Sequence, residues 1–436
     1  MCQTSPMSSP APAPARRITA RGRLALRLAA AATWASRRTG RGGGSMIGGL
    51  VALKVAPDLM SQLAAGRSTV LITGTNGKST TNRMLAAALD CLGPLATNAD
   101  GANMDAGLVA ALAAAPTAPR ACLEVDELHV PHVADAVRPS AAVLLNLSSD
   151  QADRVGSVAG IEARLRAGLA RHPDCVPVAN CDDVLITSIA RDNPATVWVS
   201  VGRPGSADIE SCPRCGGALA RGGAEAPLDW RCTSCDLARP TPTWRLDGAD
   251  LHAPDGAVRT LDLALPGEVN LGNAAQSIAA AALLGVDVET AARAAESISE
   301  VSGRYRTIER GGHLARTLLA KNPAGWRESL AMADPDAAVV ITVNARMGDG
   351  YDLSWLWDVP FERFAGRTVT VTGERAADLA VRLDYAGVVY REAPDALAAI
   401  DACPPGPVEV LANYTAMTDL MRAVDAETAR GGKDAR

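Results

Sequence analysis

The feature that most constrains this chain is a short apolar strand that runs directly into a glycine-containing loop, in the sequence LITGTNGKST at residues 71–80. A strand that continues through such a loop into a helix leaves backbone N–H groups unpaired at the helix N-terminus, where the helix dipole is positive. Gly74 and Gly77 allow the backbone to approach a polyphosphate closely, and Lys78 supplies a positive charge. The segment therefore predicts a phosphate-binding loop in an α/β domain.

The spacing of this loop differs from the standard Walker A pattern, which needs a glycine five residues before the Gly-Lys pair. That position is Ile72 here. GTNGK[ST] is instead similar to the compressed loop of the Mur ligase family, which includes the folylpolyglutamate synthases. The resemblance implies that the ligand is ATP. The loop residues expected to bind it are Gly74, Thr75, Asn76, Gly77, Lys78, Ser79 and Thr80.

Short apolar runs alternate with alanine-rich helical stretches between about residues 51 and 298, which predicts a parallel sheet covered by helices on both faces. Bound phosphates should then lie at the carboxyl ends of the strands. The strands we expect are Val70–Thr73, Arg120–Val125, Ala141–Leu145, Val176–Val178 and Thr196–Val201.

A carboxylate at the end of one of these strands completes a predicted magnesium site. Glu124 lies near the end of the expected strand Arg120–Val125 and should face the phosphate loop. Mg²⁺ prefers one or two carboxylates together with phosphate oxygens, so Glu124 and the hydroxyl of Ser79, with Thr80 as the alternative hydroxyl, are the expected ligands. Glu124 also matches the metal-binding glutamate of the Mur ligases. The alternative interpretation is a surface acid at a strand end.

The segment LPGEVNLGNAA at residues 265–275 resembles the GxxNxxN segment with which Mur ligases hold the adenosine end of the nucleotide. The resemblance implies that Asn270 and Asn273 bind ATP, and an asparagine side chain offers the donor and the acceptor that a purine edge requires. Arg304 matches the arginine of the domain junction, which can reach the γ-phosphate. The alternative role for either asparagine is a helix cap.

Four of the ten cysteines form a CxxC…CxxC pattern with sixteen residues between the two pairs. Each CxxC presents two thiolates to one tetrahedral Zn²⁺, and four protein ligands leave no open position, so the predicted role is structural. Disulfides are the alternative, and a reducing cytosol disfavours them. We predict a zinc ribbon at about residues 205–240, with the ligands Cys212, Cys215, Cys232 and Cys235.

One motif departs from the amino-acid-adding Mur ligases. These enzymes usually carry an Asn, an Asp-His pair and a second His in this segment. This chain keeps the Asn as Asn146 and the Asp as Asp150, but it has Gln151 in place of the first His and Arg154 near the position of the second. No counterpart of the lysine that many of them carbamylate is evident. The departure argues against ordinary peptide-adding chemistry.

The C-terminal third distinguishes between family members. The segments KNPAGW at residues 321–326 and DGYDLSWLWD at residues 349–358, together with the predicted zinc ribbon, closely resemble the MurT family, the ligase-like subunits of lipid II isoglutaminyl synthase. The resemblance covers roughly residues 18–425. It implies ATP-dependent amidation of the D-glutamate α-carboxylate in the lipid II stem peptide to D-isoglutamine, as a step of peptidoglycan synthesis.

The same resemblance implies a heterodimer with a GatD-type glutaminase subunit that supplies ammonia. No Cys-His pair of this chain looks like a glutaminase nucleophile and base, which agrees with an external ammonia source. The resemblance assigns Asp352 the completion of the partner's Cys-His dyad, and its alternative role is a turn or cap residue. The residues expected to carry out catalysis are Asp352, Lys78 and Glu124.

Some positions differ from that family. The usual Asn-Asp-Asn is Asn344-Ala345-Arg346 here, an expected arginine is Ser149, and an expected glutamate is Asp100. Two rival functions therefore stay open. One is a stand-alone Mur-type or folylpolyglutamate-type amino-acid ligase. The other is a non-catalytic, nucleotide-binding scaffold.

The expected domains are a disordered, basic N-terminal arm at residues 1–45, a central ATP-binding domain with the zinc ribbon at 46–300, and a smaller α/β C-terminal domain at 301–436. Between Arg16 and Arg41 there are eight arginines and no acid, interleaved with Leu24, Leu26, Leu28 and Trp34. This segment could be a basic amphipathic helix on an anionic membrane, a helix packed by its leucines on the next domain, or an organellar transit peptide.

Composition sets the remaining limits. With 48% hydrophobic and 21% charged residues the chain is typical of a soluble globular protein, and no apolar run is long enough to cross a membrane. The net charge of −5 argues against a general nucleic-acid-binding protein. We predict a cytoplasmic protein that can act on lipid II at the inner face of the cell membrane.

Overall fold

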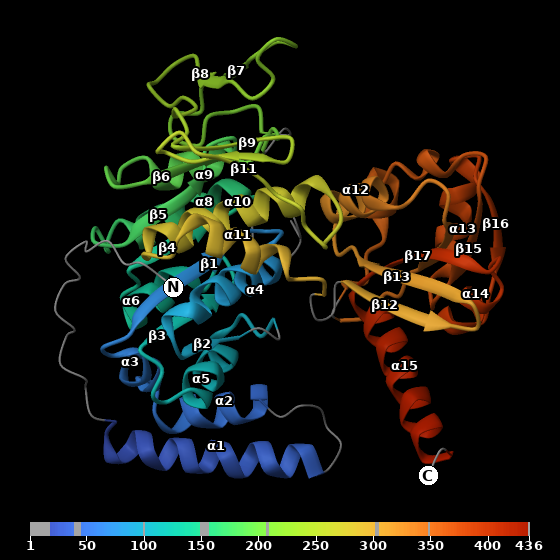
Figure 1. Ribbon diagram of the computed structural model, residues 1–436, viewed down its shortest axis with the longest axis horizontal. Coiled ribbons are helices and arrows are strands. Elements are labelled where there is room, and N and C mark those ends of the chain that lie inside the picture. Colours follow the sequence, from blue (N-terminus) through green and yellow to red (C-terminus); the bar gives the residue numbers. More distant parts are fainter. Residues whose placement is uncertain are drawn as a thin grey trace. The chain divides into compact units, whose positions relative to one another are not determined.

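The computed structural model describes residues 18–38, 45–98, 101–148, 157–205, 209–300, 305–347 and 349–434. It contains two compact units (Figure 1). The first comprises residues 1–264 and 268–298, and the second comprises residues 265–267 and 299–436.

A nine-stranded sheet in the order β11-β10-β9-β6-β5-β4-β1-β3-β2 forms the centre of the first unit. The strands from β9 to β2 in this order run parallel, whereas β10 and β11 continue the sheet as antiparallel strands. All five strands predicted from the sequence are present. The strands are β1 (Ser68–Thr73), β2 (Leu95–Thr97), β3 (Arg120–Glu124), β4 (Ala141–Leu144), β5 (Val176–Asn180), β6 (Val197–Ser200), β9 (Trp244–Asp247), β10 (Asp250–His252) and β11 (Val258–Thr260).

Helices cover both faces of this sheet, as predicted for a parallel sheet. Alternate strand residues such as Leu71, Leu123 and Leu144 join a buried cluster with residues of α3, α5, α6, α8 and α9. The helices α4, α10 and α11 pack on one another and on the sheet. The bounds are α3 (Leu59–Ala64), α4 (Lys78–Leu89), η1 (Asp90–Leu92), α5 (Asp105–Ala114), α6 (Val130–Val137), α8 (Val158–Leu169), α9 (Val184–Ala190), α10 (Glu268–Leu283) and α11 (Val288–Glu296).

Two further helices, α1 (Ala20–Arg38) and α2 (Ser45–Val55), precede the sheet; α2 packs between α1 and α5 (Figure 1). The backbone N–H of Thr19 donates to Gln62 Oε1 at 2.9 Å, which ties the start of α1 to α3. The basic segment is therefore a packed helix over residues 20–38, in agreement with the helical alternatives given for it. The prediction of disorder for residues 1–15 lies outside the described residues.

An insertion between β6 and β9 carries the four cysteines. It forms a two-stranded antiparallel sheet of β7 (Leu219–Arg221) and β8 (Trp230–Cys232). Trp230 and Leu237 pack with Val184 of α9 in a small buried cluster that also contains Cys212 and Cys232.

The second unit is a smaller α/β domain, as predicted. Its six-stranded sheet has the order β12-β13-β17-β14-β15-β16, and only the β12–β13 pair is antiparallel. The elements are β12 (Tyr305–Arg310), β13 (His313–Leu319), α12 (Pro323–Met332), β14 (Ala338–Thr342), η2 (Ser354–Asp358), η3 (Phe361–Phe364), β15 (Thr368–Thr372), α13 (Ala376–Tyr385), β16 (Val389–Glu392), α14 (Ala396–Asp401), β17 (Gly406–Ala412) and α15 (Tyr414–Asp434).

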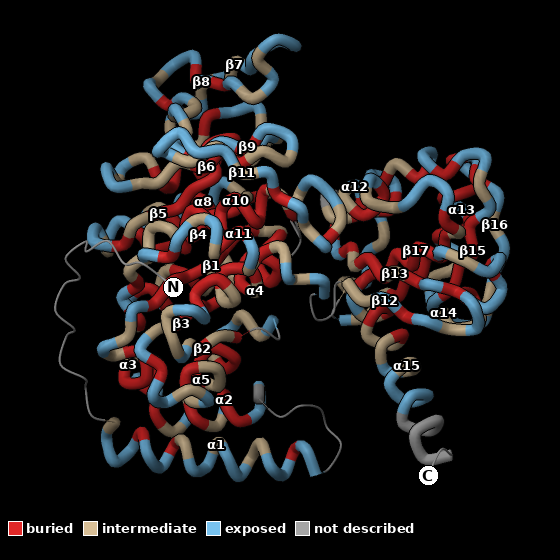
Figure 2. The backbone as a smooth tube through the Cα atoms, in the orientation of Figure 1, coloured by how far each residue is buried: buried red, intermediate tan, exposed pale blue. Residues whose placement is uncertain are grey.

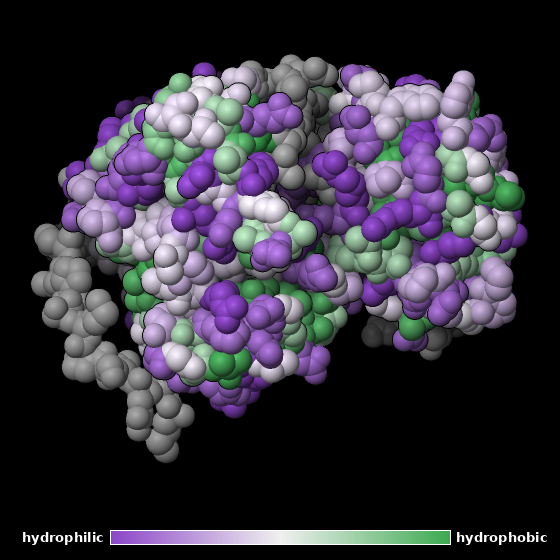
Figure 3. Space-filling view, turned by 90° about the horizontal axis from the view of Figure 1, so that it is seen from above, coloured by the Kyte–Doolittle hydropathy of each residue, from purple (hydrophilic) through white to green (hydrophobic). Residues whose placement is uncertain are grey.

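One tryptophan of each C-terminal motif contributes to the core of the second unit. Trp326 is fully buried, stacks on Trp355 with ring centroids 5.6 Å apart, and meets the edge of Phe361. Buried positions line the strands of each unit in Figure 2, and Figure 3 shows polar side chains over most of the visible face of each. Among the described residues, no helix is long and apolar enough to cross a membrane.

Candidate functional site

The predicted phosphate loop lies between β1 and α4, at the carboxyl end of a central strand. Gly77 immediately precedes α4 with φ 87° and has no side chain to cap the helix, so the first N–H groups of α4 can receive an anion. At Gly74, with φ 145°, a Cβ atom would lie 2.8 Å from Leu145 Cβ. Both positions therefore require glycine, as the sequence indicated.

Lys78 is the first residue of α4, and its side chain folds back over the loop. Its Nζ atom donates to the backbone oxygens of Gly74 and, at 3.2 Å, of Thr75. It also forms an ion pair with Glu127 Oε2 at 3.2 Å. Sequence reasoning did not assign Glu127 a role, although an acid three residues after Glu124 was a signal for it.

Asn146, which follows the end of β4, holds the loop in place. Its Oδ1 accepts from the backbone N–H of Asn76 at 2.9 Å, and its Nδ2 donates to Asn76 O at 3.1 Å. Its own carbonyl accepts from the N–H of Thr75 at 2.8 Å. These three bonds fix two loop residues, so Asn146 is a positioning residue for the phosphate loop.

Glu124 ends β3, one strand away from the loop. It pairs with Ile72 across the sheet, which places its side chain at the edge where β1 enters the loop. The carboxylate is only 2% exposed; Oε1 accepts from Asn103 Nδ2 at 3.3 Å, whereas Oε2 has no hydrogen-bond partner among the described residues. A buried carboxylate oxygen without a partner is costly unless a cation binds it. The donor set therefore suits Mg²⁺.

The side chains that hold Glu124 were missed at the sequence level. Asn98 forms two backbone hydrogen bonds with it: Asn98 Oδ1 accepts from Glu124 N at 2.9 Å, and Asn98 Nδ2 donates to Glu124 O at 2.7 Å. Nothing in the spacing of Asn98 and Asn103 indicated this, because they follow a different strand.

The two predicted adenosine-binding asparagines lie in α10 and are buried against the phosphate loop. Asn273 Nδ2 donates to Asn270 Oδ1 at 3.2 Å. A Cβ atom on Gly77 would come within 2.5 Å of Asn273 Oδ1. The fold thus brings Asn273 to the loop, and neither asparagine caps α10, because both lie inside it. Several motif residues lie outside the described residues: Arg304, Asp100, Ser149, Asp150, Gln151 and Arg154.

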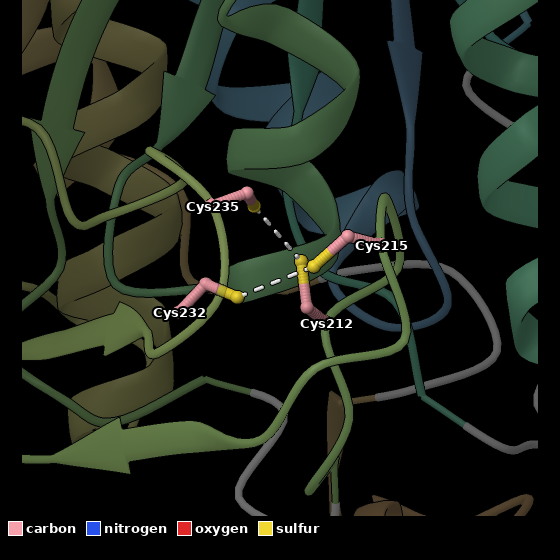
Figure 4. Close-up of side chains that lie close together, drawn as sticks. All are labelled: Cys212, Cys215, Cys232 and Cys235. Atoms are coloured by element: carbon pink, nitrogen blue, oxygen red, sulfur yellow. Dashed lines mark hydrogen bonds between the residues drawn. The ribbon is translucent and has the colours of Figure 1, made fainter.

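The four predicted zinc ligands converge in the insertion (Figure 4). Their sulfur atoms all lie within 4.8 Å of one another, with Cys212 Sγ 3.7 Å from Cys235 Sγ and Cys215 Sγ 3.4 Å from Cys232 Sγ. Zn–S bonds of about 2.3 Å in a tetrahedron place sulfurs about 3.8 Å apart, so the spacing suits one Zn²⁺ and is too long for a disulfide.

Backbone N–H groups support the thiolates of this cluster. The N–H of Gly217 donates to Cys215 Sγ at 3.4 Å, and that of Ser234 donates to Cys232 Sγ at 3.3 Å. The bond from Ser234 lowers the pKa of Cys232 to about 7, whereas the pKa of Cys215 is raised, because the bond from Gly217 is outweighed by the thiols of Cys232 and Cys235. A lowered thiol pKa favours the ionised form, which is the form that binds metal.

Asp352 lies on the surface of the second unit, at the start of η2. It accepts from the backbone N–H of Ser354 at 2.8 Å and from its hydroxyl at 3.0 Å. These bonds lower the pKa of the Asp352 carboxyl, which is therefore ionised at neutral pH. Asp352 thus closes the turn that precedes η2, and the residue is still exposed to solvent.

Asn344 and Arg346, at the site of the Asn344-Ala345-Arg346 departure, line a cavity of about 690 Å³ in the second unit. Arg346 forms ion pairs with Glu374 at 2.7 Å and with Asp419 at 2.8 Å. Asn344 lies beside it and accepts from the N–H of Glu374 at 2.9 Å. The arginine that replaces the usual asparagine is therefore paired within the chain.

Comparison with known proteins agrees with this geometry. The Mur ligase middle domain matches residues 72–281, which contain the phosphate loop, Glu124 and both α10 asparagines. The MurT ligase C-terminal domain matches residues 319–417. The parallel sheet, the loop and the buried acid define the first unit as a Mur ligase-type ATPase domain.

Curated relatives extend over most of the chain. The MurT subunit of lipid II isoglutaminyl synthase from Streptococcus pneumoniae is 28% identical over 373 residues, which is 79% of this chain and 83% of that protein. The MurT subunit from Staphylococcus aureus strain COL is 29% identical over 389 residues, 84% and 88% of the two chains. Over most of its length the chain is similar to the MurT branch of the Mur ligase family.

Solved structures share the fold at lower sequence identity. A pseudomurein peptide ligase type C from Methanothermus fervidus superposes with a TM-score of 0.64 at 18% identity, covering 83% of this chain and 79% of that one. MurF from Acinetobacter baumannii gives a TM-score of 0.63 at 20% identity, covering 87% and 80%. These similarities show a Mur ligase-type α/β fold.

Proposed function

We propose that this chain is the ligase subunit of a glutamine-dependent lipid II amidating enzyme. It would convert the D-glutamate α-carboxylate of the stem peptide to D-isoglutamine with ATP. The observation that carries the proposal is the MurT ligase C-terminal match at residues 319–417, in a chain that also matches the Mur ligase middle domain at residues 72–281. The similarity to proteins named as lipid II isoglutaminyl synthase subunits supports the substrate.

The chemistry follows from the weakness of a carboxylate as an electrophile. Transfer of the γ-phosphoryl group of ATP to the substrate carboxylate creates an acyl phosphate, whose phosphate leaves when ammonia attacks the carbonyl carbon. ADP and phosphate are released, and the product is the amide. Such phosphoryl transfer depends mainly on positioning and charge stabilisation.

In the first unit, the residues proposed to do this surround the phosphate loop. The loop N–H groups and Lys78 would bind the ATP phosphates, and Lys78 is already oriented by Glu127. Mg²⁺, when bound, would neutralise phosphate charge, and Glu124 with Ser79 or Thr80 would hold it. The unpartnered Oε2 of Glu124 supports this assignment. Asn270, Asn273 and Arg304 remain proposed nucleotide contacts.

Ammonia is proposed to come from a GatD-type glutaminase subunit, and Asp352 is proposed to orient the catalytic histidine of that partner. Its ionised, accessible carboxylate suits this role, because an acid that orients a histidine must be charged. Large side chains near it in the sequence are exposed, including Met347, Tyr351 and Trp357. Exposed apolar side chains of this kind are characteristic of a protein interface.

The four-cysteine cluster is proposed to bind one structural Zn²⁺. The sulfur spacing supports this role, and all four positions of a tetrahedral ion would be filled by protein. We also propose that residues 46–300 act as the ATP-binding domain and residues 301–436 as the partner-facing domain, in the cytoplasm at the membrane face.

One assay distinguishes the proposed amidation from the two rival functions, a stand-alone amino-acid ligase and a non-catalytic scaffold. The purified chain is incubated with lipid II and ATP, with and without glutamine and a glutaminase partner, and ADP release is measured. The proposal predicts turnover that requires glutamine, or ammonium at high concentration, and lipid II. Turnover stimulated by an amino acid instead would indicate a stand-alone ligase. ATP binding without turnover in any combination would indicate a scaffold.

A further inference from the structure

The two N-terminal helices carry most of the exposed apolar side chains of the first unit. Among its described residues, eight large apolar side chains are exposed, and the two outside these helices are Met104 and Val258. The six within α1 and α2 are Leu24, Leu28, Trp34, Met46, Ile47 and Leu50. Such a concentration of exposed apolar groups in two packed helices indicates a surface that meets another phase or molecule.

Helix α1 packs mainly through its small residues and turns its large ones outward. Its buried positions are Gly22, Ala25 and Ser36. Leu24 and Leu28 are exposed, and Figure 2 shows exposed positions along most of α1. A Cβ atom on Gly22 would lie 2.5 Å from Gln62 Oε1, so this face cannot hold a larger side chain without movement. The alternative in which leucines pack α1 on the next domain therefore holds only for Leu26, which is half-buried against the core.

The outward face of α1 combines leucines with arginines. Leu24 and Leu28 are four residues apart and share one side of the helix, and Arg23 and Arg27 lie on the adjacent strip with the same spacing. Trp34 is 65% exposed, with the Arg38 guanidinium 5.6 Å from its ring centre.

The charge of this region is entirely positive. Residues 1–57 contain no aspartate or glutamate. Arg21, Arg23, Arg27 and Arg38 form no ion pair with any residue that the structure describes; Arg21 and Arg23 donate to the backbone oxygens of Val55 and Ile18. These guanidinium groups are thus available to an external anion.

We infer that α1, with the exposed side chains of α2, docks the protein on an anionic phospholipid surface. Leucines can enter the boundary between headgroups and acyl chains, and tryptophan favours that depth. Arginines can extend along their apolar stems to lipid phosphates. A partner protein could also cover the leucines, but its surface would have to be negatively charged, because all charged side chains of α1 are positive. No described helix spans a bilayer, so the contact is interfacial.

The test is sedimentation of the full chain with lipid vesicles that contain no lipid II. Vesicles of phosphatidylcholine mixed with phosphatidylglycerol are compared with pure phosphatidylcholine. Truncation of the apolar strip (Leu24→Ala with Leu28→Ala) and loss of charge (Arg23→Gln with Arg27→Gln) should each weaken binding to the anionic vesicles about tenfold or more. All four positions are exposed, so thermal unfolding should be unchanged.

Matched controls remove the same groups elsewhere. Val381→Ala with Val389→Ala truncates two exposed apolar side chains of the second unit, and Arg363→Gln removes an exposed arginine. These variants should bind the vesicles as the parent chain does.

Absence of parent binding to the anionic vesicles, or equal binding by the α1 variants, would overturn the inference. So would α1 variants that keep vesicle binding but no longer copurify with the glutaminase, since α1 would then face a protein. Because the vesicles lack lipid II, failure here leaves the proposed amidation untouched.

Discussion

Replacement of Gly77 by alanine probes the phosphate loop and the α10 asparagine together. Gly77 has φ 87°, a conformation that costs a residue with a Cβ atom ~1–2 kcal/mol. The new Cβ would also lie 2.5 Å from Asn273 Oδ1, so Asn273 must move. Movement breaks its 3.2 Å hydrogen bond to Asn270, which contributes about 1 kcal/mol. The expected loss in free energy of unfolding is therefore about 2–3 kcal/mol.

Gly285→Ala is the matched control. Gly285 has φ 88°, almost the same backbone conformation, but a Cβ atom added there would have open space within 4 Å. It should cost only the backbone strain, about 1–2 kcal/mol. Urea unfolding of the two variants then measures the contribution of the contact with Asn273 directly.

Nucleotide binding supplies the second readout. Because the displaced Asn273 lies against the loop, Gly77→Ala should weaken ATP binding at least about tenfold, whereas Gly285→Ala should not change it. Truncation of the obstructing side chain in the double variant Gly77→Ala/Asn273→Ala should restore about 1 kcal/mol of stability relative to additivity. Equal destabilisation by the two glycine variants, with normal ATP affinity in both, would refute the reasoning.

Three further substitutions test the remaining assignments. Lys78→Ala should abolish ATP-dependent turnover with little loss of fold, measured beside the exposed control Lys54→Ala; full activity would remove Lys78 from the phosphate site. Cys232→Ser should reduce bound zinc from one ion per chain and lower the thermal unfolding temperature, measured by elemental analysis and calorimetry; a metal-free parent protein would contradict the cluster assignment. Asp352→Asn should block glutamine-driven amidation but retain turnover with high ammonium chloride, because an amide cannot stabilise an imidazolium on the partner. Equal loss with both nitrogen sources would place Asp352 in the ligase site.

The strand positions and the glycine-containing loop before α4 could be predicted because each depends on a local pattern. Apolar runs located β1, β3, β4, β5 and β6, and the Gly-Lys spacing located the N-terminus of α4. The cysteine spacing likewise predicted four converging sulfurs, which lie within 4.8 Å of one another. The strands and the loop are formed by residues that are neighbours in sequence, and the cysteine cluster is formed by two copies of the same CxxC motif.

Contacts between distant segments could not be predicted in the same way. Asn98 holds Glu124 from another strand, and Asn146 fixes Asn76 from about seventy residues away, with no spacing rule to indicate either pairing. The sequence left open a helix α1 packed by its leucines, but its buried positions are small residues, whereas Leu24 and Leu28 face outward. A prediction from hydrophobicity alone would bury the leucines and expose the small residues, which is the reverse of what the structure shows.

The most direct test of the central claim follows the amide nitrogen of glutamine into the product. The chain is combined with a GatD-type glutaminase, ATP, lipid II and glutamine labelled with a heavy isotope only at its amide nitrogen, and the stem peptide is analysed by fragment mass spectrometry. The account predicts one labelled nitrogen on the α-carboxamide of D-glutamate, with ADP formed in equal amount. Unlabelled lipid II, or label elsewhere in the stem peptide, would contradict it.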